Sequence, residues 1–239
     1  MNKLGLMCLL SAVLAPIGTA GSIVIGTADA GSGNSFPFGG LIAGAGTIYQ
    51  QVYAPAAFTS ENNRLGPIYI TSVHFYRTQY GSPADTITDA TYTLKLSYTT
   101  ALVNTLNTTD FAANVGAGQV TIGTYAITSA NDQVGSGLDF EQNVSDFFFI
   151  PDGDHGRLLL EIDLSNIGTR GTSYLDAMNG DAAGFFSRAD DFGDGFRNFG
   201  LVTGFGYRDA AVPEPATLGL IGTGLLGVAF LRGRRYLSF

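Results

Sequence analysis

The stretch TYTLKLSYTT, residues 91–100, shows the clearest two-residue alternation in the sequence. Its even-numbered residues from Tyr92 to Tyr98 are aromatic or aliphatic, whereas Thr93, Lys95 and Ser97 lie between them. Side chains two residues apart lie on the same face of a β-strand. The stretch therefore predicts a strand with one buried face and one face turned to solvent.

Several other segments have the composition of strands. Pro67–Tyr76 is rich in β-branched and aromatic residues, which fit a pleated, half-buried surface. Arg157–Leu164 alternates leucine or isoleucine with Glu161 and Asp163, so its aliphatic side chains would point inward. The remaining predicted strands are Thr47–Tyr53, Val120–Ile127, Asp146–Ile150, Phe185–Ser187 and Phe199–Tyr207.

Turn-forming segments separate these strands. YGSPAD (residues 80–85), IPDGDHG (150–156) and FGDGF (192–196) combine glycine, proline and aspartate, which favour tight turns. The segment NTTDFAANVG (107–116) would form one helical turn at most. Strands joined by turns without alternating helices predict an all-β fold, here an antiparallel β-sandwich of jelly-roll type.

The first 20 residues have the features of a secretory signal peptide. Lys3 supplies the positive start, and Leu4–Ile17 is an uncharged stretch of suitable length, expected to be helical. Cleavage after Ala20 is preferred because this position adjoins the apolar stretch, and cleavage after Ala30 is the alternative. An N-terminal membrane anchor is less favoured, because the stretch is short for a span and contains Pro16.

The 16 residues from Ala216 to Leu231 carry no charge. As a helix they would extend about 24 Å, somewhat less than the roughly 30 Å of a bilayer core. Arg232, Arg234 and Arg235 can reach the headgroups and would keep their end in the cytoplasm. A buried core helix is the alternative, but such a helix normally has a polar face. A single short transmembrane helix is therefore predicted.

Residues 21–211 remain as one predicted domain between the two ends. The whole chain has 12 Lys+Arg and 20 Asp+Glu. Four of these cations and one of the acids lie in the ends, which leaves 8 and 19 and a net charge near −11. Such a domain would repel nucleic acid. The only cysteine, Cys8, lies in the predicted signal peptide, so the exported chain would form no disulfide.

The C-terminal segment 212–239 resembles the PEP-CTERM sorting signal of Gram-negative, biofilm-forming bacteria. The motif is Val212-Pro213-Glu214-Pro215, followed by the short apolar span and the basic end. The resemblance implies an exosortase as partner, a membrane transpeptidase that acts at or near the motif. The chain would be anchored transiently in the inner membrane and then transferred to the cell surface or exterior, often in company with exopolysaccharide. The two prolines favour an extended, accessible segment, which suits processing.

Two acidic segments have some features of calcium loops. PDGDHG (151–156) begins like one, but Arg157 stands where an EF-hand requires glycine, so a simple turn is preferred. RADDFGDGFRNFG (188–200) could hold Ca²⁺ weakly, although a solvated acidic loop is favoured. The candidate ligands are Asp190, Asp191 and Asp194, with Asn198 as a further oxygen donor.

The sequence contains no recognisable catalytic or cofactor motif. It lacks the G-x-S-x-G, H-E-x-x-H and P-loop patterns. Gly222–Gly227 matches a dinucleotide fingerprint, but it lies in the predicted membrane span and not in a βαβ unit. His74 and His155 have no signature partner and are expected to be structural or exposed; strict alternation would place His74 on the face of Ile68 and Ile70.

These observations predict a non-enzymatic, exported protein of the cell surface or matrix, with no cofactor. One alternative is a carbohydrate-binding module, in which exposed aromatic rings stack on an extracellular polysaccharide. A second alternative is an extracellular hydrolase, whose paired carboxylates would be distant in the sequence. For the carbohydrate-binding alternative, the candidate aromatic residues are Tyr49, Tyr53, Tyr69, Tyr80 and Phe196.

Overall fold

The computed structural model describes residues 20–27, 33–34, 46–60, 63–76, 88–127, 140–169, 175–179, 184–191 and 199–210. All of them belong to one compact unit, Thr19–Ala210. The predicted signal helix, the Pro-Glu-Pro motif, the predicted C-terminal helix and its arginines lie outside the described residues. Within the described residues, no helix is both long and apolar enough to span a bilayer.

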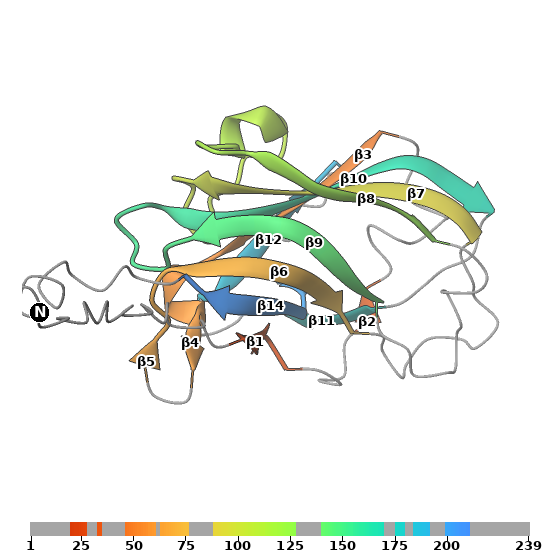
Figure 1. The fold of residues 1–239 in the computed structure, drawn as a ribbon. Coiled ribbons are helices and arrows are strands. Elements are labelled where there is room, and N and C mark those ends of the chain that lie inside the picture. The colour runs from red at the N-terminus through yellow and green to blue at the C-terminus, as the bar shows by residue number, and fades with distance from the viewer. Residues whose placement is uncertain are drawn as a thin grey trace, which may run out of the picture. The chain divides into compact units, whose positions relative to one another are not determined.

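Two large antiparallel sheets form most of the described part of this unit, which confirms the predicted all-β class (Figure 1). The four-stranded sheet has the order β1 (Ala20–Ile25), β14 (Thr203–Asp209), β6 (Ile68–Phe75), β9 (Phe140–Phe149). The five-stranded sheet has the order β12 (Phe186–Asp190), β3 (Thr47–Tyr53), β10 (Arg157–Thr169), β7 (Thr88–Thr99), β8 (Val120–Ile127).

Smaller elements complete the described part of the unit. Asp110 caps the 3-10 helix η2 (Phe111–Asn114) through a hydrogen bond from the Ala113 N–H, so the predicted single helical turn is present. The other small elements are a sheet of β13 (Phe199–Leu201), β11 (Leu175–Asn179) and β2 (Gly33–Asn34), a hairpin of β4 (Thr59–Ser60) and β5 (Asn63–Arg64), and the 3-10 helix η1 (Pro55–Ala57).

The strand order follows the winding of a jelly roll. Without β12, the two main sheets contain eight strands, which in chain order are β1, β3, β6, β7, β8, β9, β10 and β14. Numbered one to eight, they read 1-8-3-6 in the first sheet and 2-7-4-5 in the second. This order is that of a double Greek key, in which the chain passes repeatedly from one sheet to the other.

The two sheets share one hydrophobic core. Leu94 and Leu96 of β7 are fully buried, as the alternation in residues 91–100 predicts, and they belong to the same cluster as Ile70 and Phe205 of the opposite sheet. In Figure 1, β7, β8 and β10 lie in one layer and β6, β9 and β14 in the other. An aromatic cluster at the centre joins the layers; its members are Tyr53, Phe58, Phe149 and Phe205.

A β-bulge corrects the prediction for His74. In the pairing of β6 with β14, Tyr207 lies opposite Ile70 and Gly206 opposite Ser72, so β6 has one extra residue between them and the alternation of its side chains changes phase there. Ile70 and Val73 are therefore both buried in the core, and His74 lies on the opposite face from Ile70. Strict alternation fails here because Thr71 has no counterpart in β14.

The predicted strand Phe199–Tyr207 is divided in two. Leu201 pairs with Ala177 of β11, whereas Thr203 pairs with Phe75 of β6. Between them, the N–H of Val202 donates to the carbonyl of Asp176. The segment is extended throughout, but it changes partner strand at Val202, and a sequence pattern cannot indicate such a change.

We expect Phe58→Ala to lower the free energy of unfolding by about 3–5 kcal/mol, because it empties a fully buried site between the sheets. The Phe58 ring lies 4.9 Å from Phe149 and 5.7 Å from Phe205, centroid to centroid. Urea unfolding followed by tyrosine fluorescence would measure the change, since the chain has 11 tyrosines and no tryptophan. Phe185→Ala is the control, because that side chain is exposed, and should cost about 1 kcal/mol or less. Equal losses would contradict the assignment of Phe58 to the core.

Candidate functional site

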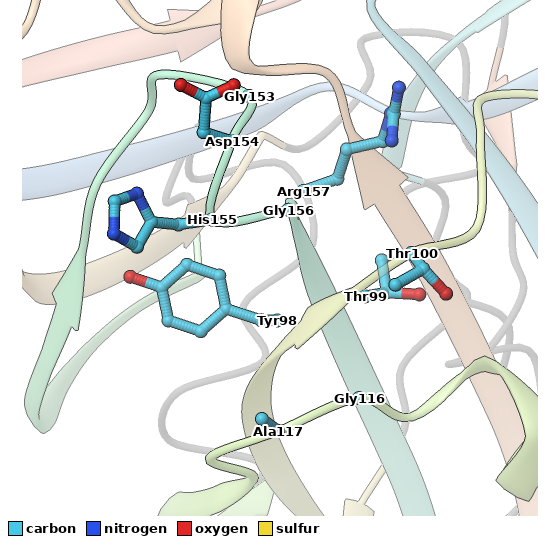
Figure 2. Close-up of a pocket in the computed structure, with 10 residues that line it drawn as sticks. All are labelled: Tyr98, Thr99, Thr100, Gly116, Ala117, Gly153, Asp154, His155, Gly156 and Arg157. Carbon is cyan, nitrogen blue, oxygen red and sulfur yellow. The ribbon is translucent and has the colours of Figure 1, made fainter.

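An open pocket of about 260 Å³ lies where β7 ends and β10 begins. Tyr98 and Thr99 of β7 form one wall, and the turn from Gly153 to Gly156 forms another. In Figure 2, the Tyr98 and His155 rings lie toward one side of the view, and Arg157 and Thr100 toward the other. The pocket thus brings together an aromatic ring, a hydroxyl and side chains that can carry charges of both signs.

Tyr98 is held rigidly in this wall. Its hydroxyl donates to the carbonyl of Phe148 at 3.3 Å and accepts from the Ile150 N–H at 3.0 Å. Its ring centroid lies 5.6 Å from that of Phe149, at the margin of the core. Burial of the phenol is the main cause that raises the pKa of Tyr98 above its usual value. Tyr98 therefore presents a fixed, neutral ring to the pocket.

Two glycines let the pocket loops approach β7 closely. A Cβ on Gly116 would lie 2.5 Å from the carbonyl oxygen of Tyr98, and one on Gly156 would lie 2.9 Å from that of Thr99. Gly156 also has a φ of 104°, a conformation that favours glycine. The Gly116 N–H donates to the Tyr98 carbonyl at 2.8 Å. The shape of the pocket thus depends on the lack of side chains at these two positions.

The predicted turn at residues 151–156 is present, and Asp152 stabilises it. Its Oδ1 accepts the N–H groups of Asp154 at 2.9 Å and His155 at 3.1 Å, and its Oδ2 lies 2.7 Å from His155 Nδ1. The backbone bond from His155 is the largest cause that lowers the pKa of Asp152 below its usual value. Both oxygens of Asp152 thus close the turn, in agreement with the preferred prediction of a simple turn between two strands.

The second calcium candidate is only partly described. Asp190 is the last residue of β12; it is buried and lies 3.2 Å from Arg188 Nε. Asp191 is exposed, and Asp194 and Asn198 lie outside the described residues. Among the residues that the structure describes, no three or more His, Cys, Asp or Glu side chains form a group suited to a metal ion. The Asp190 carboxylate thus serves a buried ion pair in the sandwich.

The predicted aromatic platform is wrong for Tyr49 and Tyr53. Both side chains are fully buried, because β3 lies between β12 and β10 and its inner face packs into the core. The Tyr49 hydroxyl contacts Gln51, and the Tyr53 hydroxyl donates to Thr203 at 2.8 Å. Burial raises the pKa of both phenols well above the usual value. Tyr80 and Phe196 lie outside the described residues.

Tyr69, in contrast, lies partly exposed on the outer face of the four-stranded sheet. Its ring is 5.3 Å from that of Phe148, and the Arg208 guanidinium lies 4.0 Å from its centroid. The Tyr69 and Phe148 planes are inclined by 54°, so the two rings do not form a coplanar surface. On the same strand, His74 stacks on Tyr76 at 4.2 Å, an arrangement that suits a structural histidine.

The outer face of the five-stranded sheet carries a network around Lys95. Its Nζ lies 2.9 Å from Glu161 Oε1 and also contacts Asp163. Gln50 donates to the other oxygen of Glu161 at 2.5 Å and accepts from Asn114 at 2.7 Å. Burial tends to lower the pKa of Lys95, but its bonds to the two carboxylates raise it overall. The two acids therefore neutralise one lysine on the sheet surface.

Comparison with known proteins identifies one segment of the chain. The family model of the PEP-CTERM protein-sorting motif matches residues 211–235. The match begins two residues after β14 ends at Asp209, so it covers the Pro-Glu-Pro motif and the basic residues predicted from the sequence. No curated protein and no solved structure matches the chain.

We expect Asp152→Asn to lower the melting temperature at pH 7, because asparagine keeps an acceptor for the turn but loses the charge. The folded state lowers the pKa of Asp152, so its charge contributes stability above the unfolded pKa of about 3.9. This contribution is lost as the pH falls through the lower folded pKa. The difference in melting temperature should therefore shrink below about pH 4.

Circular dichroism melts from pH 7 to pH 2 would measure this difference. Asp154→Asn is the matched control, because it removes an exposed charge from the same turn. A difference that stays constant with pH, or a larger effect of Asp154→Asn, would contradict the role of Asp152.

Proposed function

We propose that this chain, which carries a PEP-CTERM sorting signal, is a component of the cell surface or extracellular matrix. Its sorting motif indicates an exported protein that is recognised by an exosortase-type membrane protein. The β-sandwich would be anchored transiently at the inner membrane through the segment after the motif. Processing would then transfer it to the exterior, where it interacts with other matrix components and catalyses no reaction.

The observation that carries this proposal is the position of the motif directly after a completed domain. The last described strand, β14, pairs with both β1 and β6, so the described strands of the sandwich are all in place before residue 211. The N–H of Ala210 donates to the carbonyl of Pro67 at 2.9 Å. Removal of the residues after the motif would therefore delete none of the described strands.

The beginning of β1 supports processing at the other end of the domain. Ala20, after which the signal peptide is predicted to be cut, pairs with Arg208 near the end of β14. The first and last described residues of the domain thus lie at the same end of one sheet. This arrangement suits a precursor that is attached to a membrane through both of its ends.

Two features of the described residues favour a non-enzymatic role. Glu161 and Asp163 would be candidates for a hydrolytic carboxylate pair, but both are bound to Lys95. Each of the two histidines has a structural contact. His74 stacks on Tyr76, and His155 contacts Asp152 within the turn.

Replacement of Pro213, Glu214 and Pro215 by alanines should block the C-terminal processing. In a host with an exosortase, we expect the wild-type chain to lose its C-terminal segment and to leave the membrane fraction. The triple variant should keep the segment and stay with the membrane, because the extended recognition site is lost. Intact mass spectrometry of each cell fraction would measure both effects.

The control is the wild-type chain in a host that lacks the exosortase, where it should behave as the triple variant does. If wild type and variant had the same mass and location in both hosts, sorting through this motif would be wrong.

The mature chain should begin at Gly21 and not at residue 31. Cleavage after Ala30 would delete β1, whose Ile23 and Ile25 are 9% and 2% exposed and belong to the core. It would also leave the edge of β14 without its partner strand. N-terminal sequencing of the exported protein would identify the residue.

A matched test is Ala20→Phe, because signal cleavage requires a small residue and the Ala20 side chain is exposed in the sandwich. We expect uncut precursor to accumulate in this variant. A wild-type chain that starts at residue 31 would overturn the assignment.

A further inference from the structure

We propose that the pocket between the end of β7 and the turn 151–156 binds one uncharged sugar ring of an extracellular polysaccharide. This inference rests on the proposed function, because it requires the sandwich to reach the exterior. The pocket residues lie between positions 98 and 157, apart in the sequence from the sorting motif at residues 211–235.

The Tyr98 ring supplies the apolar surface that a sugar needs. A pyranose has one face of C–H groups and a rim of hydroxyls, so its sites combine an aromatic ring with a few polar groups. Tyr98 is suited to this task because its hydroxyl is already bonded to Phe148 and Ile150. The ring is fixed before a ligand arrives, which reduces the entropy lost on binding.

The other lining groups provide both donors and acceptors. Asp154 can accept from sugar hydroxyls, Arg157 can donate to them, and Thr100 can do either. His155 lies beside Asp154 on the same turn, and its position is set by its contact with Asp152 at 2.7 Å. Sugar hydroxyls both donate and accept hydrogen bonds, so they can pair with these donors and acceptors. An apolar ligand would leave most of these groups without partners.

Size and charge narrow the ligand class. The volume of about 260 Å³ is below the roughly 300–1,000 Å³ of sites for drug-sized ligands, which suits a single ring. The pocket is open, so a polymer can continue beyond the bound ring. At this turn Asp152 and Asp154 outnumber Arg157, and residues 21–211 carry a net charge near −11 (8 cationic and 19 acidic residues). Uronate-containing polymers would therefore be repelled.

Affinity electrophoresis of the mature secreted chain tests this proposal. The gels would contain dextran, a linear β-1,3-glucan, galactomannan or alginate. We expect at least one of the three neutral polymers to slow the wild-type chain, and alginate to have no effect. The double variant Asp154→Ala/His155→Ala should bind that polymer at least tenfold more weakly, because both side chains line the pocket and are exposed.

Asp191→Ala is the matched control, because it removes an exposed acid that does not line the pocket. It should be slowed as the wild type is. Thermal melts would show that all three chains are folded at the temperature of the gel. The proposal is overturned if no neutral polymer slows the wild type, if the double variant is slowed equally, or if alginate slows the chain most.

These outcomes are distinct from failure of the proposed function. A chain that is processed and exported but is not slowed by any neutral polymer would overturn the sugar site alone. A chain that keeps both ends in every host, yet is slowed through Asp154 and His155, would overturn the sorting proposal and leave the pocket assignment in place.

Discussion

The pairing of β10 with both β3 and β7 is the constraint on which the rest of the sandwich depends. Leu160 of β10 lies opposite Gln51 on one side and Leu96 on the other, so the strand is the centre of the five-stranded sheet. Its inner residues Leu158, Leu160 and Ile162 are fully buried in the core. Each of them removes apolar surface from water, about 1.5–3 kcal/mol per side chain by the usual scale.

The same strand also determines what lies outside the core. Because side chains alternate, burial of Leu160 and Ile162 turns Glu161 and Asp163 toward the outer face, where both contact Lys95 of β7. Ser97 of β7 is almost fully buried on that face, although the sequence predicts an exposed side chain. The reason is the segment 100–119, whose Leu106 packs on Val52 and Leu159. A loop thus covers part of a face that alternation alone assigns to solvent.

Sequence patterns predicted those parts of the fold that depend on local periodicity. Thr47–Tyr53 and Val120–Ile127 are strands with the predicted bounds, and β7 buries the predicted face. The errors occur where a neighbouring strand decides the outcome. The bulge in β6 reverses the phase after Ile70, and the partner change at Val202 divides one predicted strand into two. The sequence does not show that Tyr49 and Tyr53 are buried, because the position of β3 between two other strands is not a local property.

The pocket could not have been predicted, because its walls come from residues that are distant in the sequence. Tyr98, Ala117 and Gly156 meet only when β7, the segment before β8 and the turn before β10 come together. Part of the pocket does have a local pattern in the sequence. Gly116 lies shortly before the predicted strand Val120–Ile127, and Gly156 lies directly before Arg157–Leu164. They indicate turns, but they do not show that the turns approach the same strand, which depends on the contacts at the Tyr98 and Thr99 carbonyls.

The pocket and the two ends of the domain share one end of the sandwich. Phe148 of β9 links the pocket to the four-stranded sheet. Its carbonyl accepts a hydrogen bond from the Tyr98 hydroxyl, and it lies opposite Tyr69 of β6. Tyr69 pairs in turn with Arg208, and Arg208 with Ala20. A row across four strands therefore leads from the pocket wall to the start of β1 and the end of β14. The hydrogen bond of Tyr98 thus connects the pocket wall to the same register of strands that holds the described ends of the domain.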